Sequence, residues 1–157
     1  MTPELLRLIR IRAEQGTEAL DVAAAEHNAK CADYFTREDD GLTQPWCNGW
    51  GDEPARVWCN PPYSDIRAWV EKAHAEWQDH CDLIVMLLPA NRVEQRRWQD
   101  LIEPYRDGRN GHDFMRVEFL PGRMRFDRPG WTPGPKGDRP PFGCCLVIFG
   151  PLSKEQA

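Results

Sequence analysis

A continuous apolar run at residues 82–88 (DLIVMLL), which ends at Pro89, sets the strongest limit on the architecture of this chain. An apolar run of this length is typical of a strand that is buried on both faces of a parallel sheet. The run is far too short to span a bilayer, and the start of the chain (MTPEL) lacks the features of a secretion signal. We therefore expect a cytoplasmic protein with no membrane partner.

Other segments of the 157-residue chain alternate between strand-like and helix-like patterns. Thr2-Pro3 begins an apolar helical pattern that ends at Gly16, Ser64 is placed to cap a helix whose apolar residues extend to Trp77, and residues 93–102 also have a helical pattern. The predicted strands lie at residues 19–23, 30–35, 56–59, 114–120 and 144–149. This alternation predicts a three-layer α/β fold with a largely parallel central sheet. The length favours a single domain over residues 1–150, with an exposed, mobile loop at 127–142 and a tail at 151–157.

The segment Cys59-Asn60-Pro61-Pro62-Tyr63-Ser64 directly follows the predicted strand at residues 56–59. Each proline fixes its own φ and has no N–H to donate, and Pro61 restricts Asn60 to an extended conformation. The segment is therefore a rigid turn that presents acceptors without donors. Loops at the carboxyl ends of strands are the usual ligand sites of open α/β sheets.

The chemistry that suits this turn is the binding of one planar –NH₂ group. The Asn60 carboxamide oxygen and the Pro61 carbonyl oxygen can accept both N–H groups, which disfavours delocalisation of the nitrogen lone pair. Fixed acceptors also stabilise the positive charge that develops when such a nitrogen attacks an electrophile. Tyr63 provides a ring for stacking, which is worth about 1–3 kcal/mol per base in nucleic-acid complexes.

The chain resembles the phage-type DNA N6-adenine methyltransferases, a family of small S-adenosylmethionine-dependent enzymes. The resemblance runs in order through LDVAAAEHNAKCADYFTREDDGL (20–42), VWCNPPYS (57–64), VMLLPANRVEQ (85–95) and FLPGRMRF (119–126). It implies a Rossmann-like methyltransferase domain that methylates the 6-amino group of a flipped-out adenine in double-stranded DNA.

The resemblance also implies site residues. The catalytic turn would be Asn60, Pro61, Pro62 and Tyr63. The residues around S-adenosylmethionine would be Thr2, Pro3, Asp21, Ala23, Asp40, Gly41, Leu42 and Asn60. Asp21 would accept from the ammonium group of the donor and Asp40 from its ribose or adenine, although Ala23-Ala24-Ala25 stands where methyltransferases usually carry a Gly-x-Gly loop.

The charge distribution is compatible with DNA despite a net charge of −5. Residues 1–90 carry 8 Lys and Arg against 16 Asp and Glu, whereas residues 91–157 carry 12 against 9. A more cationic second half favours one face that meets a polyanion. The predicted DNA contacts are Tyr63, Ser64, Arg92, Arg123 and Arg125, with Arg96, Arg97 and Arg128 as further phosphate-binding candidates.

Two other functions remain open: methylation of a glutamine side-chain amide in a protein, and a catalytically silent DNA-binding module. No obligate protein partner is evident from the sequence. The six cysteines are irregularly spaced and lack a Cys-x-x-Cys pair. We therefore expect buried free thiols rather than a zinc site or disulfides. Trp46, Trp50 and Trp58 are expected to pack in the core, and Cys59 to be buried filling rather than a nucleophile.

Overall fold

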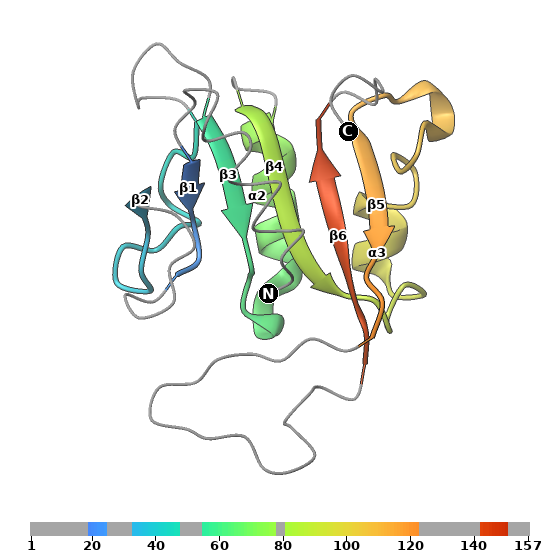
Figure 1. The fold of residues 1–157 in the computed structure, drawn as a ribbon, viewed down its shortest axis with the longest axis horizontal. Helices are drawn as coiled ribbons and strands as arrows, with labels where there is room; N and C mark the ends of the chain where they lie inside the picture. Colours follow the sequence, from blue (N-terminus) through green and yellow to red (C-terminus); the bar gives the residue numbers. More distant parts are fainter. Residues whose placement is uncertain (1–18, 25–32, 48–54, 78–80, 123–141, 151–157) are drawn as a thin grey trace.

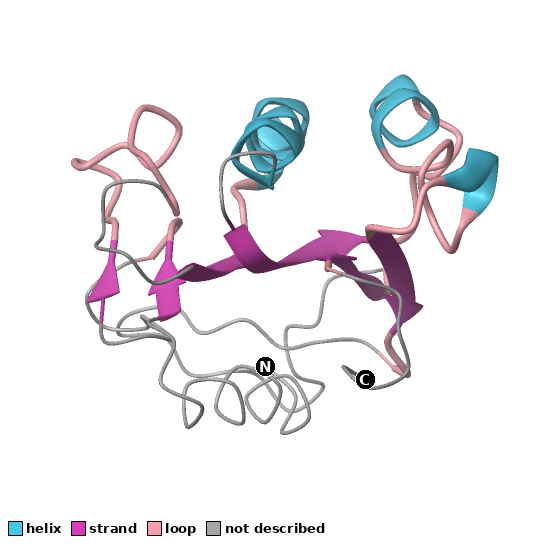
Figure 2. Cartoon of the chain, turned by 90° about the horizontal axis from the view of Figure 1, so that it is seen from above, coloured by secondary structure: helices cyan, strands magenta, loops and turns pink. Residues whose placement is uncertain are grey.

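The computed structural model describes residues 19–24, 33–47, 55–77, 81–122 and 142–150. These residues form one six-stranded sheet, with both α-helices on the same face (Figures 1 and 2). In chain order the elements are β1 (Ala19–Asp21), β2 (Asp33–Tyr34), β3 (Ala55–Cys59), η1 (Tyr63–Asp65), α2 (Ile66–Trp77), β4 (Cys81–Pro89), α3 (Arg96–Leu101), η2 (Arg109–Gly111), β5 (Met115–Phe119) and β6 (Cys144–Phe149).

The sheet has the strand order β2-β1-β3-β4-β6-β5. Strands β2, β1, β3 and β4 pair in parallel, whereas β6 pairs antiparallel with both β4 and β5. The predicted α/β class is confirmed, but the predicted largely parallel sheet is in fact mixed. The reason is that β6 inserts in the reverse direction between β4 and β5, so that both of its long ladders are antiparallel.

Strand β4 is buried on both of its faces, as its apolar sequence predicts. Ile84, Met86 and Leu88 pack with the residues of α2 in the larger hydrophobic cluster. The alternate residues Leu83, Val85 and Leu87 belong to a second cluster, on the other face, together with Trp58 and residues of β6. This alternation follows from the period of two in a strand, and it places β4 in the middle of the core.

Helix α2 packs on the sheet through the face that its sequence pattern predicts, because Ile66, Trp69, Val70 and Ala73 are all buried. Its predicted start is wrong. The chain enters α2 through the 3₁₀ turn η1, whose N-cap position is occupied by Pro62 with no side-chain cap. Ser64 therefore lies inside this turn and does not cap the helix.

The cysteines depart from the expectation of free thiols. Cys47 and Cys81 form a disulfide, which links the segment before β3 to the first residue of β4. Two cysteines 34 residues apart in sequence give no local signal of pairing; only the parallel packing of the sheet brings them together. Cys59, Cys144 and Cys145 are free and buried, and Cys31 lies outside the described residues.

Two of the three tryptophans that are expected in the core lie among the described residues. Trp46 and Trp58 are buried in the core, as predicted. Trp50, the predicted helix from Thr2-Pro3, the loop at 127–141 and the tail at 151–157 lie outside the described residues. No helix in the part of the chain that the structure describes is long and apolar enough to cross a membrane.

Candidate functional site

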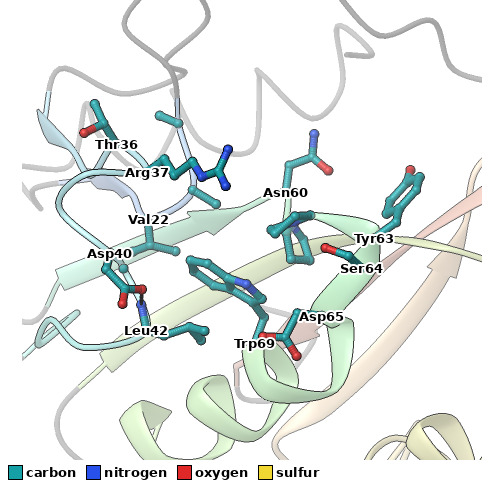
Figure 3. A pocket seen from close by; sticks show the side chains of 15 residues that line it. Val22, Thr36, Arg37, Asp40, Leu42, Asn60, Tyr63, Ser64, Asp65 and Trp69 are labelled. Carbon is teal, nitrogen blue, oxygen red and sulfur yellow. Dashed lines mark hydrogen bonds between the residues drawn. The ribbon is translucent and has the colours of Figure 1, made fainter.

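A cleft of about 780 Å³ opens at the carboxyl ends of β1, β2 and β3. These three strands are parallel neighbours, so the segments that follow them meet at one edge of the sheet. Figure 3 shows the side chains around the cleft. Its lining residues are Val22, Ala23, Ala24, Thr36, Arg37, Asp40, Gly41, Leu42, Asn60, Pro61, Pro62, Tyr63, Ser64, Asp65 and Trp69.

The turn that follows β3 lines the cleft and carries acceptors that the described residues leave unused. Among the described residues, no hydrogen bond ends on the Asn60 side chain or on the Pro61 carbonyl. The Pro62 carbonyl is occupied, because it accepts from the backbone N–H of Asp65 at 3.2 Å. The turn can therefore offer an amide oxygen and a carbonyl oxygen to a ligand with an –NH₂ group.

Tyr63 extends from the same turn and is held from the side of β6. Its hydroxyl lies 4.0 Å from the sulfur of Cys144, and its ring packs against that of Phe142 with centroids 5.7 Å apart. The side chain is nevertheless 39% exposed, which leaves part of the ring available for stacking. Burial, and then the neighbouring Cys144, raise the pKa of the Tyr63 phenol, so it stays protonated at neutral pH.

The residue before the turn, Cys59, is completely buried. Burial, together with the charge of Asp21, raises the pKa of the Cys59 thiol well above its usual value. A neutral, inaccessible thiol is a poor nucleophile. The assignment of Cys59 as core filling is therefore consistent with its surroundings.

The wall of the cleft opposite Asn60 is the turn at residues 36–44. Thr36 donates to the Asp39 carboxylate through its backbone N–H at 2.9 Å and its hydroxyl at 3.0 Å, and the Gln44 amide donates to the Asp39 carbonyl at 2.9 Å. Asp40 has a φ of 53°, a left-handed conformation that Asp tolerates, and its carboxylate accepts from the N–H of Leu42 at 3.3 Å. These bonds make the wall a compact, self-supported turn.

Gly41 lets this wall lie directly against β1 and α2. A Cβ atom at Gly41 would overlap the carbonyl oxygen of Val22 and lie 2.9 Å from Cη2 of Trp69. The Gly41 carbonyl accepts from the indole N–H of Trp46 at 2.8 Å, and Trp46 stacks on Trp69 with centroids 6.1 Å apart. The floor of the cleft thus depends on a glycine at position 41.

Most of the predicted site residues come together in this cleft. Ala23, Asp40, Gly41, Leu42, Asn60, Pro61, Pro62, Tyr63 and Ser64 all line it. Thr2, Pro3, Arg123 and Arg125 lie outside the described residues.

Two predicted residues lie elsewhere. The Asp21 side chain is not part of the cleft lining; it is 2% exposed and accepts from the backbone N–H of Ala23 at 3.3 Å. Arg92 is exposed in the turn after β4, beside Arg97 and Trp98 and away from the cleft lining.

Several lining residues are not among the predicted site residues, namely Val22, Ala24, Thr36, Arg37, Asp65 and Trp69. Thr36 and Arg37 belong to the DYFTREDDGL stretch, which carries much of the resemblance. Their place in that stretch is the feature of the sequence that could have predicted them as lining residues. Trp69 lies on the buried face of α2, and it contributes both to the core and to the cleft.

Comparison with known proteins points to a single family. A family model described as "DNA N-6-adenine-methyltransferase (Dam)" matches residues 1–124. A protein of Escherichia phage T1 named "DNA N-6-adenine-methyltransferase" is 36% identical over 81 residues, which are 52% of this chain and 32% of that protein. A protein of Haemophilus phage HP1 (strain HP1c1) with the same name is 34% identical over 82 residues, 52% of this chain and 43% of that protein. The chain thus spans less than half the length of these curated relatives.

Proposed function

Since the chain belongs to the DNA N-6-adenine-methyltransferase (Dam) family, we propose that it transfers a methyl group from S-adenosylmethionine to the 6-amino group of an adenine in double-stranded DNA. The observation that carries this proposal is that Asn60 and Pro61 both line the cleft, and that neither the Asn60 side chain nor the Pro61 carbonyl has a hydrogen bond to another described residue. A methyltransferase family implies a methyl donor. We propose S-adenosylmethionine as that donor.

The lining residues fit such a donor in size and in polarity. The cleft of about 780 Å³ lies in the range of small-molecule sites, which is about 300–1,000 Å³. Trp69 and Leu42 provide apolar surface for a nucleoside, and the carboxylate of Asp40 provides an acceptor. We assign donor binding to Ala23, Asp40, Gly41, Leu42 and Asn60, with Thr2 and Pro3 from the sequence; Asp21 shapes the β1 turn through its bond to Ala23.

The bound donor supplies an electrophilic methyl group on a sulfonium. The work of the chain is to hold the adenine amine in line with that group. The Asn60 side-chain oxygen and the Pro61 carbonyl oxygen accept its two N–H groups and stabilise the charge that develops on the nitrogen. Amide oxygens are too weakly basic to keep the proton, which passes to solvent, and the neutral phenol of Tyr63 acts as a stacking surface rather than a base.

The DNA partner would present its adenine outside the duplex. An adenine that is stacked in a duplex cannot reach the turn after β3, so base flipping is required, at a cost of a few kcal/mol. We assign Tyr63 and Ser64 to the flipped nucleotide. Arg92, Arg123 and Arg125 are assigned to DNA phosphates, which position the duplex without reading its sequence.

We also propose that the fold is a three-layer, Rossmann-like methyltransferase domain that occupies residues 1–150 and is followed by a tail. Two observations support this arrangement. The sheet is continuous from β1 to β6 and is reversed only at β6 among the described strands. The face of the sheet opposite α2 carries buried Trp58, Leu83 and Val85, as a sheet covered on both faces requires.

The test is to identify where the methyl group goes. The purified chain is incubated with a labelled donor and either DNA or a protein lysate, and nucleosides from DNA of cells that express the chain are analysed by mass spectrometry. N6-methyladenine that depends on Asn60 supports the proposal. Label in glutamine would show a protein amide methyltransferase, and absence of donor binding in calorimetry would show a silent DNA-binding module.

A further inference from the structure

Arg37 is the one cation among the described residues that line the cleft. It extends from the turn after β2, is exposed to solvent, and is accompanied in the lining by two carboxylates, Asp40 and Asp65. Figure 3 shows its guanidinium reaching across the opening toward Asn60. A charge in this position can contact a ligand at the place where the proposed reaction occurs.

The fold around Arg37 does not use this guanidinium. The turn is closed by Thr36 and Gln44, which donate to Asp39, and by the N–H of Asp40, which donates to the carbonyls of Thr36 and Arg37. The Asp39 carboxylate is engaged by Thr36, and that of Asp40 by the N–H of Leu42. Within the described residues, no ion pair or side-chain hydrogen bond involves Arg37.

We infer that Arg37 binds the α-carboxylate of the methyl donor, an assignment that rests on the proposed function. The amino-acid end of S-adenosylmethionine is joined to the sulfonium by a short aliphatic chain, so its carboxylate lies near the methyl group and therefore near Asn60. A guanidinium fork matches a carboxylate in shape and charge.

A DNA phosphate is the other anion that could approach this opening. Arg37 lies on the same wall as Asp40, Gly41 and Leu42, which are assigned to the donor, and it belongs to the cleft lining rather than to the outer surface around Arg92. The observations therefore favour the donor carboxylate. The phosphate contact is treated as an outcome of the test.

The experiment compares two donors that differ only in the carboxylate. Dissociation constants of S-adenosylmethionine and of its decarboxylated analogue are measured by calorimetry, without DNA, for the wild type and for Arg37→Gln and Arg37→Lys. Arg67→Gln is the matched control, because Arg67 is an exposed arginine on α2 that pairs with Glu71 and does not line the cleft. Thermal unfolding of each variant confirms that it is folded.

Arg37→Gln is expected to weaken binding of S-adenosylmethionine by about ten- to a hundredfold, the range for loss of a charged hydrogen bond. It should change binding of the decarboxylated analogue by less than about twofold, since Arg37 then has no carboxylate to contact. Arg37→Lys should recover part of the affinity, and Arg67→Gln should behave as the wild type. A smaller and equal loss for both donors would show a structural role and overturn the inference.

The remaining outcomes are equally decisive. Unchanged donor binding in Arg37→Gln, together with weaker and less salt-dependent DNA binding, would assign Arg37 to a phosphate and overturn the carboxylate contact. If the wild type binds neither donor, the proposed function itself fails, and the contact with it. If the wild type binds both donors and Arg37→Gln does not discriminate between them, only the contact fails.

Discussion

At the scale of single residues, the site depends on atoms that the fold leaves unused. Asn60 and Pro61 keep their oxygens free of hydrogen bonds to other described residues, while the adjacent carbonyl of Pro62 is occupied by Asp65. The two prolines fix the backbone of the turn, because each has a restricted φ and has no N–H to donate. The proposed selectivity of the turn for an –NH₂ group is thus a local property of residues 60–63.

Replacing Asn60 with Ala should lower the turnover number by about 10²–10³-fold, the usual cost of removing one preorganised electrostatic partner. Donor affinity should stay within about threefold, because the other residues assigned to the donor, Ala23, Asp40, Gly41 and Leu42, are retained. Turnover with labelled donor and calorimetry measure the two quantities. Asn91→Ala, an exposed asparagine after β4, is the control; normal turnover in Asn60→Ala would exclude the turn from catalysis.

Gly41 is a residue at which even one methyl group should be costly. Its Cβ would overlap the Val22 carbonyl and crowd Trp69, so Gly41→Ala should lower the free energy of unfolding by about 1–3 kcal/mol through overpacking. Donor binding should weaken as well, because the wall must move. Urea unfolding and calorimetry test both expectations. Gly143→Ala, whose Cβ would meet the nearest atom at 3.7 Å, should change neither quantity.

At the scale of elements, the segment between β2 and β3 joins the cleft to the core. Its first part forms the wall at residues 36–44, and its later part contributes buried Trp46 and Cys47. The Trp46 backbone N–H donates to the Glu76 carboxylate of α2 at 3.2 Å, and Cys47 is bonded to Cys81 of β4. The connection between β2 and β3 is therefore attached to both α2 and β4.

Reduction of the disulfide between Cys47 and Cys81 should lower the free energy of unfolding by about 2–4 kcal/mol, because the unfolded chain loses a cross-link. The unfolding midpoint is measured with and without reductant. In the double variant Cys47→Ser/Cys81→Ser the midpoint should be low and insensitive to reductant. Reaction of all six cysteines with a thiol reagent in the denatured, non-reduced protein would show that the bond is absent.

Helix α2 also carries a pH-sensitive contact. His74 lies among the rings of Tyr105, Phe114 and Phe149, and its Nε2 lies 2.6 Å from the Leu101 carbonyl. Burial lowers the pKa of His74 below the usual 6.5 and outweighs the opposing effect of the Leu101 hydrogen bond. The folded protein therefore resists protonation that the unfolded chain accepts.

The sign of the pH effect follows from this difference. As the pH falls through about 6.5, the unfolded chain binds the proton first, so the contribution of His74 to stability is complete above that pH and is lost below it. The unfolding midpoint between pH 7.5 and 5.5 should fall more steeply in the wild type than in His74→Phe, which keeps an aromatic ring. Parallel curves for the two proteins would contradict the assignment.

At the scale of the whole molecule, the uneven charge distribution bears on the proposed binding of DNA by an acidic protein. The net charge is −5, yet nine arginines lie between Arg92 and Arg128. If a few arginines bind DNA phosphates while the protein as a whole is negatively charged, the affinity for DNA should depend strongly on salt concentration. Affinity for unrelated DNA should be low at physiological salt.

Each phosphate-binding arginine should contribute about one unit to the slope of log K against log salt concentration. Arg92→Gln, Arg123→Gln and Arg125→Gln are therefore expected to reduce that slope by about one each, uniformly across DNA sequences. Fluorescence anisotropy over a salt series measures it. Arg109→Gln, an exposed arginine near Glu103 of the same chain, should leave the slope unchanged, and equal slopes for all variants would refute the phosphate assignment.

Local pattern was sufficient to predict much of this protein. The doubly buried strand β4, the apolar face of α2, the strand before the turn and the rigid turn with free acceptors can all be read from residues 56–89, because each depends on periodicity or on proline geometry within a few residues. The resemblance further identified most of the residues that line the cleft.

Only the tertiary structure decided how distant segments combine. It reversed β6 within the sheet, paired Cys47 with Cys81, placed Gly41 against Trp69, and brought Arg37 into the cleft that Asn60 also lines. The physical reason is common to all four. Strand order, sulfur proximity and side-chain direction depend on the packing of segments that are far apart in the chain, whereas a linear pattern records only the preferences of neighbours.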